Sequence, residues 1–147
     1  MTTLLHEQVP FHLEEIYTSE FSRIYISKEH NSLLCEAINS YIPIKDFKET
    51  FLYCSGIVEK QKIEKFIFDK RALTSFHQPS MEWYFLVWKK EMLELGLAFH
   101  RKILPKEEWF RQCVHACKTQ MLAVKEHQFL EKIDLLYFDS IQECLEN

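Results

Sequence analysis

The sequence predicts an α/β domain built on a mixed, mostly parallel β-sheet. The first observation is a strand-like apolar segment, Lys65–Asp69, followed by an aromatic helical segment, Met81–Leu95, and a second strand-like segment, Phe99–Leu104. Strand, helix and strand in this order form a βαβ unit, whose two strands lie parallel. The second observation is a polar turn between two apolar segments, Ser22–Ser27 and Leu33–Tyr41, which predicts an antiparallel β-hairpin near the N-terminus.

An amphipathic helix is expected between the hairpin and the βαβ unit. After Pro43, apolar side chains recur at three- and four-residue spacing: Ile44, Phe47, Phe51, Cys54 and Val58. This spacing places them on one helical face, which then packs on the sheet. The following strand, Lys65–Asp69, is apolar throughout its centre. Such strands are usually covered on both faces, so we expect this one to be central.

The helix Met81–Leu95 carries recognisable signals at both ends. Ser80 is placed to cap its N-terminus, and Glu82 lies in the first turn, where the helix dipole favours a carboxylate. Gly96 is placed to end it. The rest of the chain predicts, in order, a helix from Lys106, a strand over Ile133–Phe138 and a short helix over Ser140–Glu146.

Length and composition predict a single domain. The chain has 147 residues and is 47% hydrophobic, which is enough to bury a core. Residues 1–10 read as a flexible N-terminal arm and residues 11–147 as the domain. The two glycines exclude the glycine-rich loops that hold phosphates, and we expect no cofactor.

Charge and cysteine content limit the class of protein further. A net charge of −4 gives no basic footprint for nucleic acid. The chain shows neither a signal peptide nor an apolar run long enough to span a membrane. Five cysteines, an odd number without paired close spacing, suit reduced thiols in a cytoplasmic protein.

Four segments together resemble a known family: the hairpin from Ser22 to Tyr41, the strand Lys65–Asp69 with its polar loop, the helix from Ser80, and the terminal segment Ile133–Ser140 before its helix. In this order they resemble the SpoIIAA-like, or STAS-like, domains of bacterial anti-sigma-factor antagonists. The resemblance implies a small sheet with packed helices and a regulatory role without catalysis, as in an uncharacterised bacterial branch of this family.

The resemblance also implies a phosphorylation switch, and here the sequence departs from the pattern. The antagonists carry an Asp-Ser-Ser-Gly-type segment after the central strand, and its serine is phosphorylated. In this chain the corresponding segment runs from Asp69 to Ser80 and lacks the Ser-Gly core. Asp69 matches in type and Ser80 lies at a similar helix start, so Ser80 is the candidate phosphorylation site.

The candidate site lies at the carboxyl end of the central strand, where α/β sheets gather ligands. Its polar members are Asp69, Arg71, Thr74, Ser75, His77 and Ser80. A phosphate on Ser80 would be favoured by the free N–H groups of a helix N-terminus. The alternative is that Ser80 only caps the helix, Asp69 only anchors the loop, and His77 is solvated.

Aromatic side chains on and near the following helix extend this site. Trp83, Tyr84, Phe85, Trp88 and Phe99 could line an apolar pocket, form the core or make a dimer interface. Helical geometry spreads the first four over more than one face, so at least one ring is expected to be exposed or covered by a partner. Trp83 and Tyr84 are therefore candidate binding residues.

The sequence gives little support for a metal site or for a catalytic nucleophile. Cys113 and Cys117 share a helical face, but His115 lies about 200° from Cys113 on a helix. We therefore expect two core cysteines and no metal site. The chain has no Gly-x-Ser-x-Gly motif.

These observations favour a non-enzymatic regulatory or protein-interaction module that binds through the loop Asp69–Ser80 and the helix after it. A protein partner or a homodimer is expected. The alternative is a protein that binds a small apolar, lipid-like molecule with the aromatic helix 81–95.

Overall fold

The computed structural model describes residues 1–147 and places six strands in one mixed sheet. The strands lie side by side in chain order: β3 (Glu14–Thr18), β4 (Ser22–Ser27), β5 (Ser32–Ala37), β6 (Lys65–Asp69), β7 (Phe99–Ile103) and β8 (Asp134–Tyr137). The first three are antiparallel, and β5 to β8 are parallel. The predicted α/β class, the mixed, mostly parallel sheet and the hairpin of β4 and β5 are confirmed.

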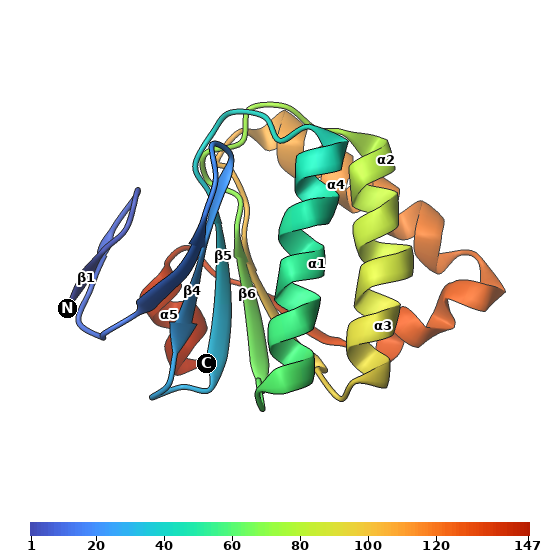
Figure 1. The fold of residues 1–147 in the computed structure, drawn as a ribbon. Coiled ribbons are helices and arrows are strands. Elements are labelled where there is room, and N and C mark those ends of the chain that lie inside the picture. The colour runs from blue at the N-terminus through green and yellow to red at the C-terminus, as the bar shows by residue number, and fades with distance from the viewer.

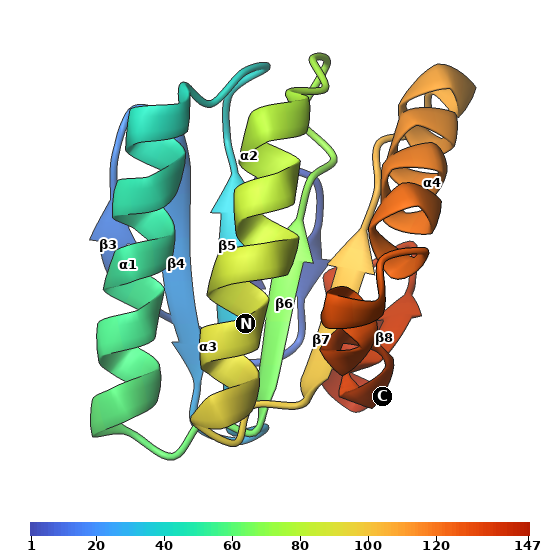
Figure 2. The ribbon, with the colours of Figure 1, turned by 90° about the vertical axis from the view of Figure 1, so that its right-hand side faces the viewer.

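Helices cover the two faces of the sheet unequally. On one face lie α1 (Ile44–Lys60), the continuous helical segment 78–94 and α4 (Glu108–Leu122), whereas α5 (Ile141–Glu146) lies on the other face (Figures 1 and 2). A 3₁₀ segment, η2 (Lys125–Lys132), connects α4 to β8. None of these helices is both long and apolar enough to cross a bilayer.

The core has two parts because side chains alternate along each strand. On the face of α1 and α4, a cluster of 24 buried residues includes Phe66 and Phe68 of β6. On the face of α5, a cluster of 10 buried residues includes Ile67 of the same strand. The apolar centre of β6 is thus covered on both sides, as predicted.

The second helix begins earlier than predicted. It consists of α2 (Gln78–Trp83), the π-helical turn η1 (Tyr84–Trp88) and α3 (Lys89–Glu94). Ser80 does not cap it: His77 is the N-cap, and its side chain accepts a hydrogen bond from the backbone N–H of Ser80. Pro79 is tolerated in this first turn because the helix makes no use of its missing N–H.

Several boundaries differ from the sequence-based expectation. The strand β3 extends the predicted hairpin to three antiparallel strands. The strand predicted over Leu33–Tyr41 ends at Ala37, and the helix expected from Lys106 begins at Glu108.

The N-terminal residues 1–10, expected as a flexible arm, contain two short strands, β1 (Thr2–Thr3) and β2 (Gln8–Val9), which pair antiparallel. Leu4 and Val9 are buried on the face of α5. The reason for the difference is apolar burial: these two side chains complete the smaller core cluster.

Candidate binding site

A pocket lies at the carboxyl edge of the sheet, beside the loop that follows β6. Four parts of the chain form it: the segment after β5, the start of α1, the loop with the first turn of α2, and the start of α4. Its lining consists of Tyr41, Ile42, Phe47, Lys70, Leu73, Ser75, Phe76, His77, Ser80, Met81 and Phe110. The free volume is about 40 Å³, which holds only about three waters. The pocket is therefore a narrow, mostly apolar slot.

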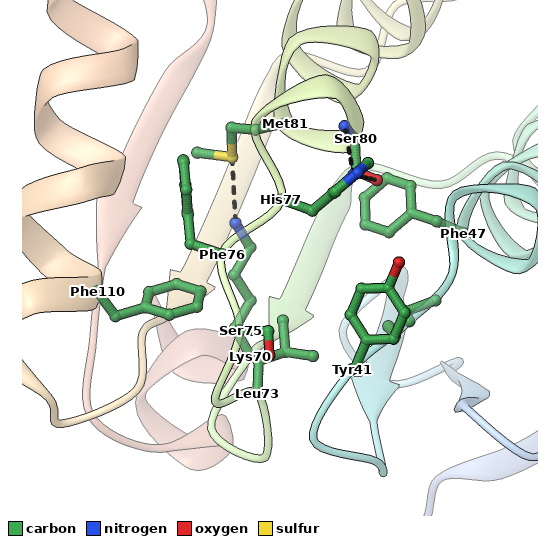
Figure 3. A pocket seen from close by; sticks show the side chains of 11 residues that line it. Tyr41, Phe47, Lys70, Leu73, Ser75, Phe76, His77, Ser80, Met81 and Phe110 are labelled. Atoms are coloured by element: carbon green, nitrogen blue, oxygen red, sulfur yellow. Dashed lines mark hydrogen bonds between the residues drawn. The ribbon is translucent and has the colours of Figure 1, made fainter.

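Lys70 is the charged residue of this slot. Its side chain extends between two aromatic walls, Phe76 and Phe110 on one side and Tyr41 and Phe47 on the other (Figure 3). Its Nζ donates to the sulfur of Met81 at 3.6 Å. A thioether is a weak acceptor, so the ammonium group lacks a strong partner. Burial lowers the pKa of Lys70 to about 8.

Two further buried lysines lie behind Lys70. The Nζ atoms of Lys89 and Lys102 are 4.2 and 4.0 Å from the ring centroid of Phe85, and neither has a hydrogen-bond partner. Burial, reinforced by neighbouring lysines, lowers the pKa of both well below the usual value. The three lysines make no ion pair.

Asp69 and Arg71 belong to a different network, on the α5 face of the sheet. Asp69 accepts from the backbone N–H and the Nε of Arg71, both at 3.0 Å, and from its Nη2 at 2.8 Å. The same Nη2 donates to Glu7 at 2.6 Å. Neither Asp69 nor Arg71 lines the pocket. Asp69 thus anchors the start of the loop.

His77 and Ser80 pair at the start of α2. The Oγ of Ser80 and the Nδ1 of His77 are 2.8 Å apart, and the same nitrogen accepts from the backbone N–H of Ser80 at 3.3 Å. Ser80 is only 5% exposed. A kinase would therefore reach its hydroxyl only after this turn had opened.

The remaining predicted site residues lie apart. Ser75 and Thr74 are exposed, and of these two only Ser75 lines the pocket. Trp83 is half-buried, with the ammonium of Lys48 5.7 Å from its ring. Tyr84 is fully buried beneath the helix, and its hydroxyl has no hydrogen-bond partner. Of the predicted residues, the pocket therefore gathers Ser75, His77 and Ser80.

The cysteine-rich face of α4 forms no cluster of metal-ligating side chains. Cys117 is buried, Cys113 is half-buried and His115 is exposed. Cys117 packs in the main core cluster. Of the two cysteines expected in the core, Cys117 therefore lies there, whereas Cys113 does not belong to the buried cluster.

Four residues of the pocket are not among the site residues predicted from the sequence: Tyr41, Phe47, Lys70 and Phe110. Their positions in the sequence could have indicated them. Each lies shortly after the carboxyl end of a parallel strand or near the start of the next helix. A charged residue directly after an apolar strand, as Lys70 is, marks such an edge.

Comparison with known proteins does not place the chain in a family. No protein-family model matches the chain, and neither the curated proteins nor the solved structures give a match.

Proposed function

We propose that the protein is a non-catalytic binding module of the SpoIIAA-like kind, which holds a slim apolar molecule carrying a hydrogen-bond acceptor or an acid group. The observation that carries this proposal is Lys70, a buried cation without a strong partner in an otherwise apolar slot. Apolar pockets with a small number of polar groups are typical of small-molecule sites. The resemblance to this family rests on the order of the strands and helices along the chain.

The shape of the slot limits the ligand. With about 40 Å³ free, a ligand enters only when the rim side chains swing outward. Tyr41 is 41% exposed and Phe76 is half-buried, so both have room to rotate at the mouth. Because the walls are aromatic and close together, a single unbranched chain or a flat ring fits better than a branched molecule.

Decanoic acid and decanol, measured by isothermal titration calorimetry, test this proposal. We expect both to bind saturably, and Lys70→Met to weaken decanoate binding about tenfold and decanol binding less, because only the acid also loses an ion pair with the ammonium group. Ser75→Trp should fill the mouth and abolish binding of both. Thr74→Trp adds the same ring at the neighbouring exposed position, outside the pocket, and is the matched control. Equal binding by the two tryptophan variants would place the ligand elsewhere.

The close pair of His77 and Ser80 raises the question of a nucleophilic serine. Here the Nδ1 of His77 accepts from the backbone N–H of Ser80 and lies 2.8 Å from its Oγ, which is a helix-capping arrangement, and its Nε2 has no partner to orient the ring. We therefore expect no labelling by a fluorophosphonate probe, measured by mass spectrometry. Labelling that Ser80→Ala removes would overturn the non-catalytic proposal.

Protein interaction is the second candidate function, favoured by exposed rings near the mouth of the slot. Tyr41 is 41% exposed, and Trp109, next to the pocket residue Phe110, is 46% exposed. Aromatic side chains of this kind are enriched at interfaces. If this edge also joins two copies of the chain, Trp109→Ala should shift a concentration-dependent dimer to monomer in sedimentation velocity. A dimer that the variant leaves intact would remove this edge as the interface.

A further inference from the structure

A second pocket, of about 390 Å³, opens between α4 and the carboxyl ends of β7 and β8. Three basic residues of α4 line it: Arg111, His115 and Lys118. Their spacing of four and three residues places them on one face of the helix. The strand side contributes Tyr137, at the end of β8, and Asp139.

Hydrogen bonds orient two of the basic side chains of this pocket, and no carboxylate pairs with any of the three. The Nε of Arg111 donates to the carbonyl of Pro105 at 2.9 Å, which fixes the guanidinium group and leaves its Nη atoms free. The Nζ of Lys118 lies 3.5 Å from the hydroxyl of Tyr137 and 5.3 Å from the centroid of its ring. None of the three basic residues forms an ion pair, and neither does Asp139.

Two buried lysines, Lys89 and Lys102, lie behind the same pocket. Lys102 pairs with Tyr137 in the ladder of β7 and β8, and its Nζ has no partner. Lys118 is close enough to Lys89 and Lys102 that its charge lowers the pKa of both. The chain as a whole has a net charge of −4, so the group of basic side chains that line this pocket is local. An anion is attracted to such a pocket from solution.

We propose that this pocket binds a phosphate monoester, with the phosphate on Arg111, His115 and Lys118. Three separate donor groups along one helix suit the several oxygens of a phosphate, and the free edge of a guanidinium matches two of them. The ester group would lie against Leu104, Val114 and Phe138, the apolar part of the lining. The site is independent of the slot at Lys70, because the two linings share no residue.

Titration of the 147-residue chain with phenyl phosphate, followed by ³¹P NMR and calorimetry, tests this site. We expect saturable binding of phenyl phosphate, weaker binding of inorganic phosphate and no binding of phenol. Arg111→Gln and Lys118→Met should each weaken phenyl phosphate binding about tenfold. Lys106→Met, which removes an exposed lysine outside the pocket, is the matched control and should leave the affinity unchanged.

Three results would overturn the proposal. The first is no binding, and the second is phenol binding as tight as that of phenyl phosphate. The third is equal weakening by Lys106→Met and Lys118→Met, which would mean general attraction to a basic surface. Arg111 is exposed, so its variant should fold, and its circular dichroism spectrum verifies this.

Discussion

The buried lysines are the residues whose chemistry departs most from that of an ordinary core. Lys89 is fully buried, carries no ion pair and has no hydrogen-bond partner. Burying a charge without a partner is costly, so the group is driven toward its neutral form. The lowered pKa of Lys89 follows from this burial first and from its lysine neighbours second.

Lys89→Met should therefore stabilise the protein at pH 7, and the gain should shrink as pH rises. The unfolded chain keeps a proton on Lys89 up to pH about 10.4, whereas the folded chain loses it at lower pH. Between these two pKa values the unfolded state binds more protons, so wild-type stability rises with pH by up to about 1.4 kcal/mol per unit. The Lys89→Met variant has no ionisable group at this position, so its stability lacks this rise with pH.

Urea unfolding at pH 7, 8 and 9 measures this difference. Lys90→Met changes the neighbouring exposed lysine and is the control, with stability close to wild type at each pH. Wild-type and Lys89→Met profiles that run parallel would contradict the prediction.

At the scale of elements, α5 shows how a short helix is stabilised by distant residues. It has six residues, too few to be stable alone. Glu7 accepts from the backbone N–H of Ile141 at 2.7 Å at its N-terminal end. At the other end, Lys65 donates to the carbonyls of Cys144 and Leu145. Negative charge at the start and positive charge at the end both complement the helix dipole.

Glu7→Gln is expected to lower the free energy of unfolding by about 1–3 kcal/mol, because the Arg71 ion pair and the charged cap are lost together. Both side chains are less than one fifth exposed, at 14% and 16%, so solvent screens the pair only weakly. Urea unfolding measures the change. Glu14→Gln removes an exposed 3.9 Å pair with Lys28 and should have little effect. Equal losses in the two variants would refute the capping role of Glu7.

The elements that sequence patterns predict are those whose signals are local. The strand Lys65–Asp69 and the amphipathic helix after Pro43 follow from apolar spacing alone, and both are confirmed. The start of the second helix was misplaced because a histidine, rather than the serine, caps it. Ser140 caps α5 locally, but the contacts from Glu7 and Lys65 come from residues more than 70 positions away, and no local spacing reveals them.

Sequence patterns also fail to predict those features of the whole molecule and its sites that depend on contacts between distant segments. The carboxyl-edge rule located the loop after β6, and three of the predicted residues line the pocket there. The rule did not identify Lys70 or Phe110, because their meeting depends on how α4 packs against the loop. The basic pocket likewise depends on the approach of α4 to β8, which the sequence does not specify.

The unequal layers on the two faces of the sheet predict an order of opening. The face of α1 and α4 holds a cluster of 24 buried residues, whereas the α5 face holds 10. Local opening costs least where few apolar contacts are lost. Amides of β1, β2 and α5 should therefore exchange with deuterium first, and those of β5 and β6, covered on both faces, last.

Hydrogen exchange followed by mass spectrometry measures this order, and Glu7→Gln sharpens it. The variant should speed exchange in residues 141–146 and in β1 and β2, where Glu7 contributes its contacts. Exchange in β5 and β6 should change only by the loss in global stability, because their amides open when the whole sheet unfolds. If the α5 amides of the wild type exchanged as slowly as those of β6, the smaller layer would not open separately, and the sheet with both its layers would unfold as one unit.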